Sequence, residues 1–180
     1  LTHNFQNEYS KGGSIFADYR NTITATKKSS NIILYGHNIW SGEYFAKVTR
    51  YYDSKEADPL AFYKQHPTIT FDTIYEKAEY KIFACVLFNT KEKYGEVYPY
   101  TSKREFASKD EFNSFILDIM DRSVLWTDVD FDYGDEIITL STCYWPYGEE
   151  VDTRCVVFAR KVRSTPLYSS AASDVYKRQG

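Results

Sequence analysis

Towards its end the chain reads Glu136-Ile-Ile-Thr-Leu-Ser-Thr142 and then, after a short connection, Arg154-Cys-Val-Val-Phe-Ala-Arg-Lys-Val162. Both stretches are apolar and rich in β-branched side chains, which pack well on a pleated sheet. The connection, residues 144–153, contains a proline and a glycine, which are typical of turns. We therefore expect two neighbouring strands, and if they pair antiparallel their joined ends lie together.

The composition agrees with a β-rich globular domain. The chain has 180 residues, enough for one domain with a sizeable core. Aromatic residues make up 18% of it, with 17 Tyr and 12 Phe, and such side chains favour half-buried pleated surfaces. The net charge is −3 and no long basic block occurs, so we do not expect nucleic acid as a partner.

The rest of the chain adds strands and helices without a regular alternation. Asn31-Ile-Ile-Leu-Tyr35 is a short apolar run that stops at Gly36, which is typical of a buried strand. Ser108 and Glu111 form a capping-box pattern before apolar side chains at helical spacing, which predicts a helix over residues 108–122. Further strands are expected at residues 14–18, 68–72 and 80–88, and helices at residues 42–52 and, after Asp58-Pro59, 59–66. The predicted fold is mostly β (α+β), a sheet or barrel with two or three helices.

We take residues 1–163 as one domain and residues 164–180 as a tail. The tail has few apolar residues and no periodicity, which is typical of disorder, and its last residues resemble translated adapter sequence, so we expect it not to be native. The chain begins at Leu1 within what reads as structured sequence, so we expect the natural N-terminus to be missing. No apolar run is long enough to predict a membrane span within the chain.

The three cysteines are too few, and odd in number, for a disulfide framework. Cys85 and Cys155 lie in apolar runs, where we expect small buried side chains. Cys143 instead ends a predicted strand and precedes a loop. A nucleophilic thiol needs a nearby base or positive charge, and Arg154 begins the next predicted strand. Its guanidinium stays charged at any relevant pH and could hold a substrate carbonyl or an oxyanion.

A base for such a thiol must come from one of three histidines. His3 lies at the beginning of the chain, where we expect an exposed side chain. His66 precedes Pro67 at a predicted helix end, which favours a capping or packing role. His37 follows the predicted strand 31–35 at a strand-to-loop junction, where scaffolds often place reactive groups. His37 is the best candidate, although from spacing alone a structural histidine fits equally well.

These segments resemble the signature motifs of sortases. Thr139-Leu-Ser-Thr-Cys143 followed by Arg154 is similar to the family's Thr-Leu-x-Thr-Cys…Arg motif, and Ile33-Leu-Tyr-Gly-His-Asn38 resembles the segment that carries the catalytic histidine. Three further segments narrow the resemblance to class B sortases: residues 13–21, residues 66–72 and the helix 108–122. It implies an eight-stranded β-barrel with peripheral helices, including a long helix between strands 6 and 7, with the N-terminal part truncated here.

The resemblance also implies an activity. Class B sortases cleave a C-terminal sorting signal of the Asn-Pro-x-Thr-Asn or Asn-Pro-x-Thr-Gly kind after Thr, and pass the acyl group through a cysteine thioester to an amine of a cell-wall precursor. In this chain Cys143 would attack, His37 would act as acid and base, and Arg154 would position and stabilise. Ser141 and Thr142 would line the substrate groove.

The family's setting gives further expectations. The partners are a secreted protein that bears the signal and a peptidoglycan precursor amine. The enzyme is held by an N-terminal anchor, absent from this stretch, on the outer face of the membrane of a Gram-positive bacterium. Some class B enzymes carry an acidic residue two positions after the cysteine, where this chain has Trp145.

Two alternatives stay open. The first is a cysteine peptidase of another fold that hydrolyses its acyl-enzyme, although papain-like enzymes place the cysteine before the histidine. The second is a non-catalytic β-rich binding domain in which Cys143 is structural. No metal-ligand spacing occurs, so we predict neither a metal nor another cofactor.

Overall fold

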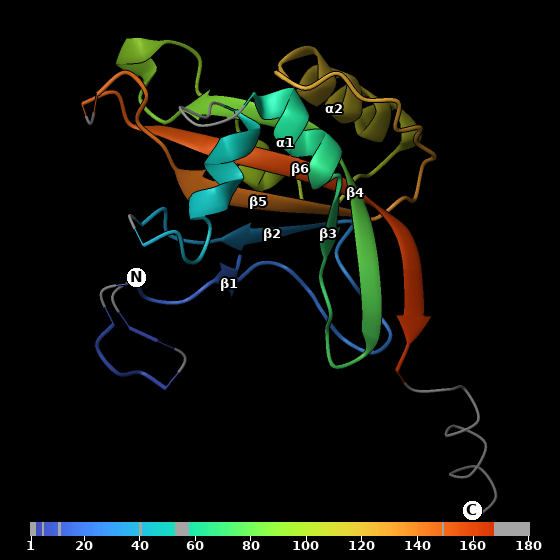
Figure 1. Ribbon diagram of the computed structural model, residues 1–180. Helices are drawn as coiled ribbons and strands as arrows, with labels where there is room; N and C mark the ends of the chain where they lie inside the picture. The colour runs from blue at the N-terminus through green and yellow to red at the C-terminus, as the bar shows by residue number, and fades with distance from the viewer. Residues whose placement is uncertain are drawn as a thin grey trace, which may run out of the picture.

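The computed structural model describes residues 3–4, 6–10, 12–39, 41–52, 58–148 and 150–167. Its framework is a six-stranded sheet in the order β1-β2-β5-β6-β4-β3. Figure 1 shows β2, β5 and β6 side by side in that order. The strands are β1 (Phe16–Ala17), β2 (Asn31–Tyr35), β3 (Thr68–Thr70), β4 (Glu76–Asn89), β5 (Ile137–Cys143) and β6 (Thr153–Pro166). The helices are η1 (Ala46–Tyr51), α1 (Pro59–Gln65), η2 (Glu92–Tyr94), η3 (Tyr100–Ser102) and α2 (Lys109–Asp121).

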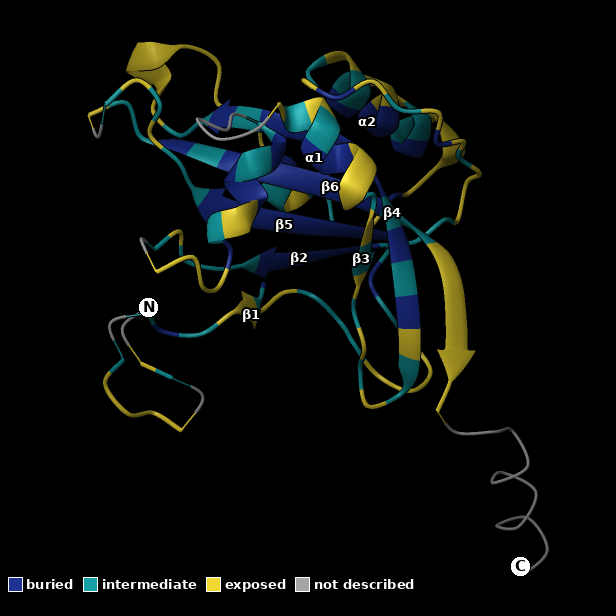
Figure 2. Cartoon of the chain, viewed as in Figure 1, coloured by how far each residue is buried: buried dark blue, intermediate teal, exposed yellow. Residues whose placement is uncertain are grey.

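The centre of the sheet comes from distant parts of the chain. β5 lies between β2, to which it pairs parallel, and β6, to which it pairs antiparallel. β6 also pairs antiparallel with β4 along most of its length, so the three longest strands are neighbours. Figure 2 shows these central strands buried and the last part of β6 exposed. The predicted antiparallel pairing of the last two strands is confirmed.

The alternation of side chains along β6 builds two cores. Cys155, Val157 and Ala159 face one cluster, which α1 and η1 cover. Val156 and Phe158 face the other, which α2 covers. This division follows from the two-residue period of a strand, which sends successive side chains to opposite faces. Much of the aromatic excess is in the second cluster, which includes Phe83, Phe88, Tyr100, Phe106, Phe112, Phe115 and Phe158.

Both predicted helix caps are present. The Asp58 side chain accepts a hydrogen bond from the backbone N–H of Leu60, and Pro59 takes the first helical position of α1. At α2 the Ser108 side chain accepts from the N–H of Glu111. The Glu111 carboxylate accepts from the N–H of Ala107, one residue earlier than in a standard capping box. The helix therefore begins where its sequence predicts.

The mostly β fold with peripheral helices is confirmed, and α2 directly precedes the strand that ends at Cys143. The described residues give six strands where the resemblance predicts eight. One reason is that some extended segments make isolated bridges rather than ladders, as between Ile23 and Lys28. The sheet has β1 and β3 as its edges within the described ranges. Helix 42–52 is shorter than predicted and of the 3₁₀ type, η1.

The end of the domain differs from the boundary at residue 163. β6 continues to Pro166 because Ser164, Thr165 and Pro166 pair with the start of β4. Those three residues therefore belong to the sheet and not to the predicted tail. Residues 168–180 lie outside the described part of the chain, so the expectation of disorder for them stays a prediction.

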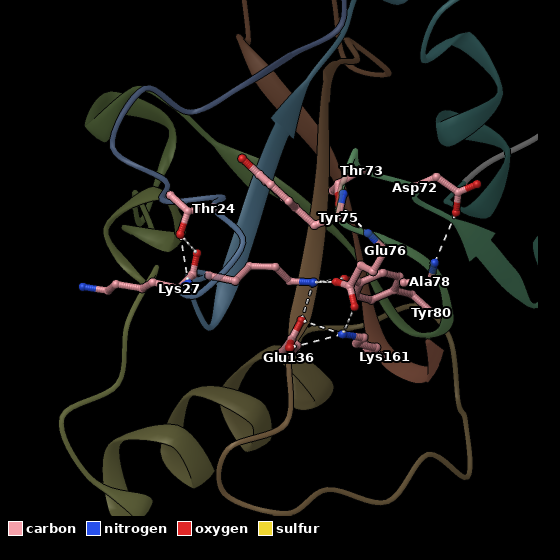
Figure 3. Close-up of polar contacts among 11 residues, drawn as sticks. Thr24, Lys27, Asp72, Thr73, Tyr75, Glu76, Ala78, Tyr80, Glu136 and Lys161 are labelled. Carbon is pink, nitrogen blue, oxygen red and sulfur yellow. Dashed lines mark hydrogen bonds and ion pairs between the residues drawn. The ribbon is translucent and has the colours of Figure 1, made fainter. Parts of the chain in front are cut away.

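An ion-pair network joins four segments at the end of the sheet opposite Cys143. Lys28 pairs with Glu76 and, at 2.6 Å, with Glu136. Lys161 pairs with the same two carboxylates at 2.7 and 3.2 Å. Figure 3 shows Glu76, Glu136 and Lys161 converging beside Tyr80. Each charge has two partners of opposite sign, as partly buried ions require.

Candidate active site

One pocket gathers the five residues that were predicted to form the site. It has a volume of about 240 Å³ and lies where β2 and β5 end and β6 begins. Its walls are Phe16, Tyr35, Gly36, His37, Ser141, Thr142, Cys143 and Arg154. The structure therefore brings Cys143, His37 and Arg154 to one cavity, together with Ser141 and Thr142. Within the described ranges no group of three or more His, Cys, Asp or Glu could hold a metal ion.

Cys143 and Arg154 meet through strand pairing. They are the last residue pair of the β5–β6 ladder, and directly opposed residues of an antiparallel pair project from the same face. The N–H of Tyr144 donates to the carbonyl of Thr153 at 3.2 Å, which closes the loop behind the pair. The geometry is thus set by the sheet rather than by the loop.

His37 is held beside Cys143 by bonds from the residues around both. The N–H of Gly36 donates to the carbonyl of Ser141 at 3.2 Å, and the Thr142 hydroxyl donates to the carbonyl of Gly36 at 2.8 Å. The Asn38 side-chain amide donates to the carbonyl of Cys143 at 3.0 Å. Hydrogen bonding to β5 thus continues one residue past the end of β2.

Gly36 is needed for this arrangement. A Cβ atom at this position would lie 2.6 Å from the ring of Phe45, closer than real side chains approach. Phe45 is a buried residue at the start of η1, and its N–H donates to the carbonyl of His37 at 2.9 Å. The glycine therefore lets the histidine loop pack directly on the core.

Ser141 and Thr142 line the pocket but are only 2% exposed each. Their hydroxyls already have partners: Ser141 Oγ lies 2.8 Å from the hydroxyl of Tyr100, and Thr142 bonds Gly36. Burial raises the pKa of Tyr100, which the hydrogen bond to Ser141 and the charge of Arg154 partly offset. The two residues thus shape the wall, and any hydroxyl contact with substrate would compete with these bonds.

Tyr35 forms another wall and is tied to a buried carboxylate. Its hydroxyl donates to Asp18 at 2.9 Å, and its ring packs on Phe16 at 5.3 Å between centroids. Arg20 donates to both oxygens of Asp18 through Nε at 2.8 Å and Nη2 at 2.7 Å. The Arg20 hydrogen bonds, joined by that of Tyr35, hold the pKa of Asp18 well below its usual range.

Arg154 is charged and anchored. Burial alone would lower its pKa, but hydrogen bonding to Asp152 and the nearby charges of Cys143 and Asp152 raise it above the ordinary value. For Asp152, burial alone would raise the pKa, but hydrogen bonds from Arg154, Trp145 and Thr90 lower it to about 2. A permanent cation therefore stands beside the thiol. Acyl transfer requires a nucleophile, a group that carries protons and a hydrogen-bond donor to the oxyanion. The cavity offers a thiol, an imidazole and a guanidinium for these three roles.

Comparison with known proteins shows the family of the chain. The family model for the sortase domain matches residues 3–162. The chain belongs to the sortase family. Sortase B of Listeria monocytogenes is 36% identical over 143 residues, which is 79% of this chain and 52% of the relative. Sortase B of Staphylococcus aureus is 30% identical over 163 residues, covering 91% of this chain and 60% of the relative. The class B resemblance is confirmed, and this sortase spans between half and three fifths of the length of these relatives.

Solved sortase B structures have the same fold. A Staphylococcus aureus sortase B–substrate complex superposes with a TM-score of 0.72 at 30% identity, over 91% of this chain and 68% of the other. Sortase B of Clostridium perfringens gives a TM-score of 0.73 at 28% identity, over 91% and 80%. None of the helices in the described part of this sortase has the length and the apolar composition of a membrane span.

The remaining cysteines and histidines of this sortase lie elsewhere. Cys85 and Cys155 are 0% exposed, with their sulfurs 3.7 Å apart, and burial raises the pKa of Cys85. His66 caps α1 through its N–H and packs its ring on Phe62. His3 is exposed and contacts Tyr9. The predictions of buried cysteines, a capping His66 and an exposed His3 are confirmed.

Several residues that no sequence motif assigned to the site surround Arg154. Asp152, Thr90 and Trp145 form a hydrogen-bonded group next to it, and Tyr100 lies behind Ser141. The only available signal was a carboxylate two positions before Arg154, where strand alternation places it on the same side. Thr90 and Tyr100 come from segments with no motif of their own.

Proposed function

We propose that the chain is the catalytic domain of a class B sortase, a cysteine transpeptidase. It cleaves a C-terminal sorting signal of the Asn-Pro-x-Thr-Asn or Asn-Pro-x-Thr-Gly kind after Thr and transfers the new carboxyl group to an amine of a cell-wall precursor. The observation that carries the proposal is the joining of Cys143, His37 and Arg154 in one pocket of a sortase fold.

The first half-reaction forms a thioester. The Cys143 thiolate attacks the carbonyl carbon of the signal's Thr, and the oxygen takes up the negative charge. Arg154 donates hydrogen bonds to this oxygen, where a charge-assisted bond gains most. The intermediate then breaks the C–N bond, and His37 gives a proton to the leaving amine. The product is a thioacyl enzyme and a free C-terminal fragment.

The second half-reaction reverses these roles. An incoming amine loses a proton to His37 and attacks the thioester carbon, and the Cys143 thiolate leaves as the new amide bond forms. Water in place of the amine would give hydrolysis, the outcome of the alternative peptidase function. A pocket that favours the amine over water thus separates the two functions.

The proposed partners follow from this chemistry. The donor is a secreted protein that carries the signal, and the acceptor is a peptidoglycan precursor amine. We place the reaction on the outer face of the membrane of a Gram-positive bacterium, with the whole protein held there by an N-terminal anchor. The sortase B relatives and the sortase B–substrate complex support the class of donor.

The test uses short peptides that end in each sorting signal. The protein is incubated with them with and without a peptide amine, and the products are identified by mass spectrometry. We expect a thioacyl adduct on Cys143 and amide product when the amine is present. Hydrolysis at an unchanged rate in the presence of amine would favour the peptidase. Absence of any adduct across the peptide set would refute the proposed function.

A further inference from the structure

We propose that Asp152 is a positioning residue that holds the guanidinium of Arg154 in the orientation needed at Cys143. The inference rests on the proposed function, in which Arg154 stabilises the developing oxyanion. Arg154 Nη1 donates to Asp152 Oδ1 at 2.5 Å, and Nη2 donates to Oδ2 at 3.4 Å. Nη1 also donates to the carbonyl of Thr153 at 2.9 Å. Two oxygens of one carboxylate thus fix the plane of the guanidinium.

Asp152 is itself fixed from two sides. The indole N–H of Trp145 donates to Oδ1 at 3.1 Å. The Thr90 hydroxyl lies 2.9 Å from Oδ2 and 2.8 Å from the Asp152 carbonyl oxygen, and it shares its proton between them. The N–H of Thr90 also donates to the Asp152 carbonyl at 3.1 Å. Thr90 directly follows β4, so the carboxylate is tied to the central sheet as well as to its own loop. A carboxylate held in this way can orient a second side chain, as supporting residues do around catalytic groups.

This arrangement leaves one edge of Arg154 for a substrate. Asp152 takes the edge between Nη1 and Nη2, and Nε has no hydrogen-bond partner among the described residues. Arg154 lines the pocket that contains Cys143, and its side chain is 28% exposed. The edge formed by Nε and the second hydrogen of Nη2 is therefore the one available to the substrate oxygen.

The role of Asp152 is geometric rather than electrostatic. Its negative charge offsets part of the positive field that Arg154 exerts on the thiolate and the oxyanion. If Asp152 acted only through charge, its removal would strengthen that field and raise the rate. If it positions Arg154, removal lowers the rate because a misaligned donor no longer meets the oxyanion. The two roles therefore predict opposite changes in rate when Asp152 is removed.

The activity test compares Asp152→Asn with the matched control Glu150→Gln. Both substitutions remove one negative charge from the same loop, but Glu150 is exposed, and no hydrogen bond or ion pair joins it to Arg154 within the described residues. We expect Asp152→Asn to lower kcat by about 10- to 100-fold, the cost of a misplaced catalytic group, with little change in KM. In an Arg154→Lys background the same substitution should add almost nothing. An increase in kcat, or an equal loss in both backgrounds, would overturn the proposal.

A second measurement does not depend on the substrate. The ¹⁵N relaxation of the Arg154 Nε–H group reports how tightly the guanidinium is held, and the signal is assigned by its loss in Arg154→Lys. We expect an order parameter near that of rigid backbone, about 0.85, to fall below about 0.6 in Asp152→Asn. An unchanged value with an unchanged melting temperature would overturn the positioning role. If the wild-type protein processes no sorting signal, the proposed function fails, and this measurement still decides whether Asp152 fixes Arg154.

Discussion

Cys143 and Arg154 are the final residue pair of the β5–β6 ladder, so their side chains project from the same face of the sheet. Strand pairing fixes the backbone positions of the nucleophile and the cation, so both side chains project from a rigid part of the sheet. The neighbouring pairs toward the core are Thr142 with Cys155 and Ser141 with Val156, all four buried. Substitutions at the site should therefore change the chemistry without unfolding the sheet.

Cys143 should be the only cysteine that reacts in the native protein. Cys85 and Cys155 are fully buried, and alkylation requires an accessible thiolate. Iodoacetamide should modify one cysteine in buffer and all three in denaturant, as counted by mass spectrometry. Native Cys143→Ser should take up no label. Labelling of Cys85 or Cys155 under native conditions would contradict the burial of these two thiols.

His37 should be the histidine on which turnover depends. We expect His37→Asn to lower kcat by about 10²- to 10⁴-fold, the usual contribution of a general acid and base. His66→Gln is the control, because His66 caps α1 through its backbone and lies outside the pocket. Steady-state kinetics on a sorting-signal peptide measure both. An equal loss of kcat in the two variants would contradict the role of His37 as the general acid and base.

Arg154 should matter for its shape as well as its charge. Arg154→Ala should lower kcat by about 10²- to 10³-fold, as the loss of an oxyanion donor does. The kcat of Arg154→Lys should lie between those of the wild type and Arg154→Ala, because lysine keeps the charge and lacks the planar guanidinium. Arg160→Lys on the same strand is the control, since Arg160 pairs with Ile137 at the other end of β5. Full activity of Arg154→Lys would show that charge alone suffices.

Phe158 should be a large contributor to stability. It is fully buried on β6, and its ring lies within 6.5 Å of the rings of Phe83, Phe88, Tyr100 and Phe115. Phe158→Ala should reduce the free energy of unfolding by about 3–5 kcal/mol. Trp126→Ala, at a residue 92% exposed, should change it by less than about 0.5 kcal/mol. Urea unfolding measures the free-energy change of both variants. Similar values for the two would contradict the placement of Phe158 in the core.

The Asp18 cluster should stabilise the protein only above acidic pH. The folded-state pKa of Asp18 is depressed, chiefly by hydrogen bonds from Arg20, so its contribution is complete above the unfolded pKa of about 4 and is lost as pH falls below it. The difference in urea midpoint between wild type and Asp18→Asn should be large at pH 6 and shrink steadily between pH 4 and pH 2. A difference that grew on acidification would have the wrong sign for a depressed pKa.

Local patterns predicted the elements whose signals lie within a few residues. The strand Asn31–Tyr35 and the caps at Asp58 and Ser108 have the expected bounds, because a continuous apolar run and a capping side chain act locally. The first part of β4, from Glu76, was missed because most of its residues are polar and partly exposed. They form a strand through pairing with the end of β6 and, at Glu79, with Thr70 of β3. Pairing partners of that kind cannot be read from the segment itself.

The candidate site was predicted unevenly for a similar reason. Cys143 and Arg154 follow from two adjacent strands and one loop. The position of His37 depends on parallel pairing between β2 and β5, a contact with no local signal. Its place at a strand end made it the best of three histidines, and mainly the family resemblance favoured a catalytic over a structural role. Asp152 and Thr90 were missed because their bonds depend on the conformation of the loop and on the end of β4.

The position of β5 between β2 and β6 has a consequence for how the protein folds. Gly36 and Thr142, which join the histidine loop to the nucleophile strand, are 106 residues apart in the chain. Contacts between such distant segments form slowly, since a long loop must close before any stabilising pairing rewards it. The edge of β2 that pairs with β5 stays unpaired until residues 137–143 have been synthesised, so the reactive centre cannot assemble before that point. The thiol site therefore forms late in folding, and the apolar β2 is open to mispairing until β5 is in place.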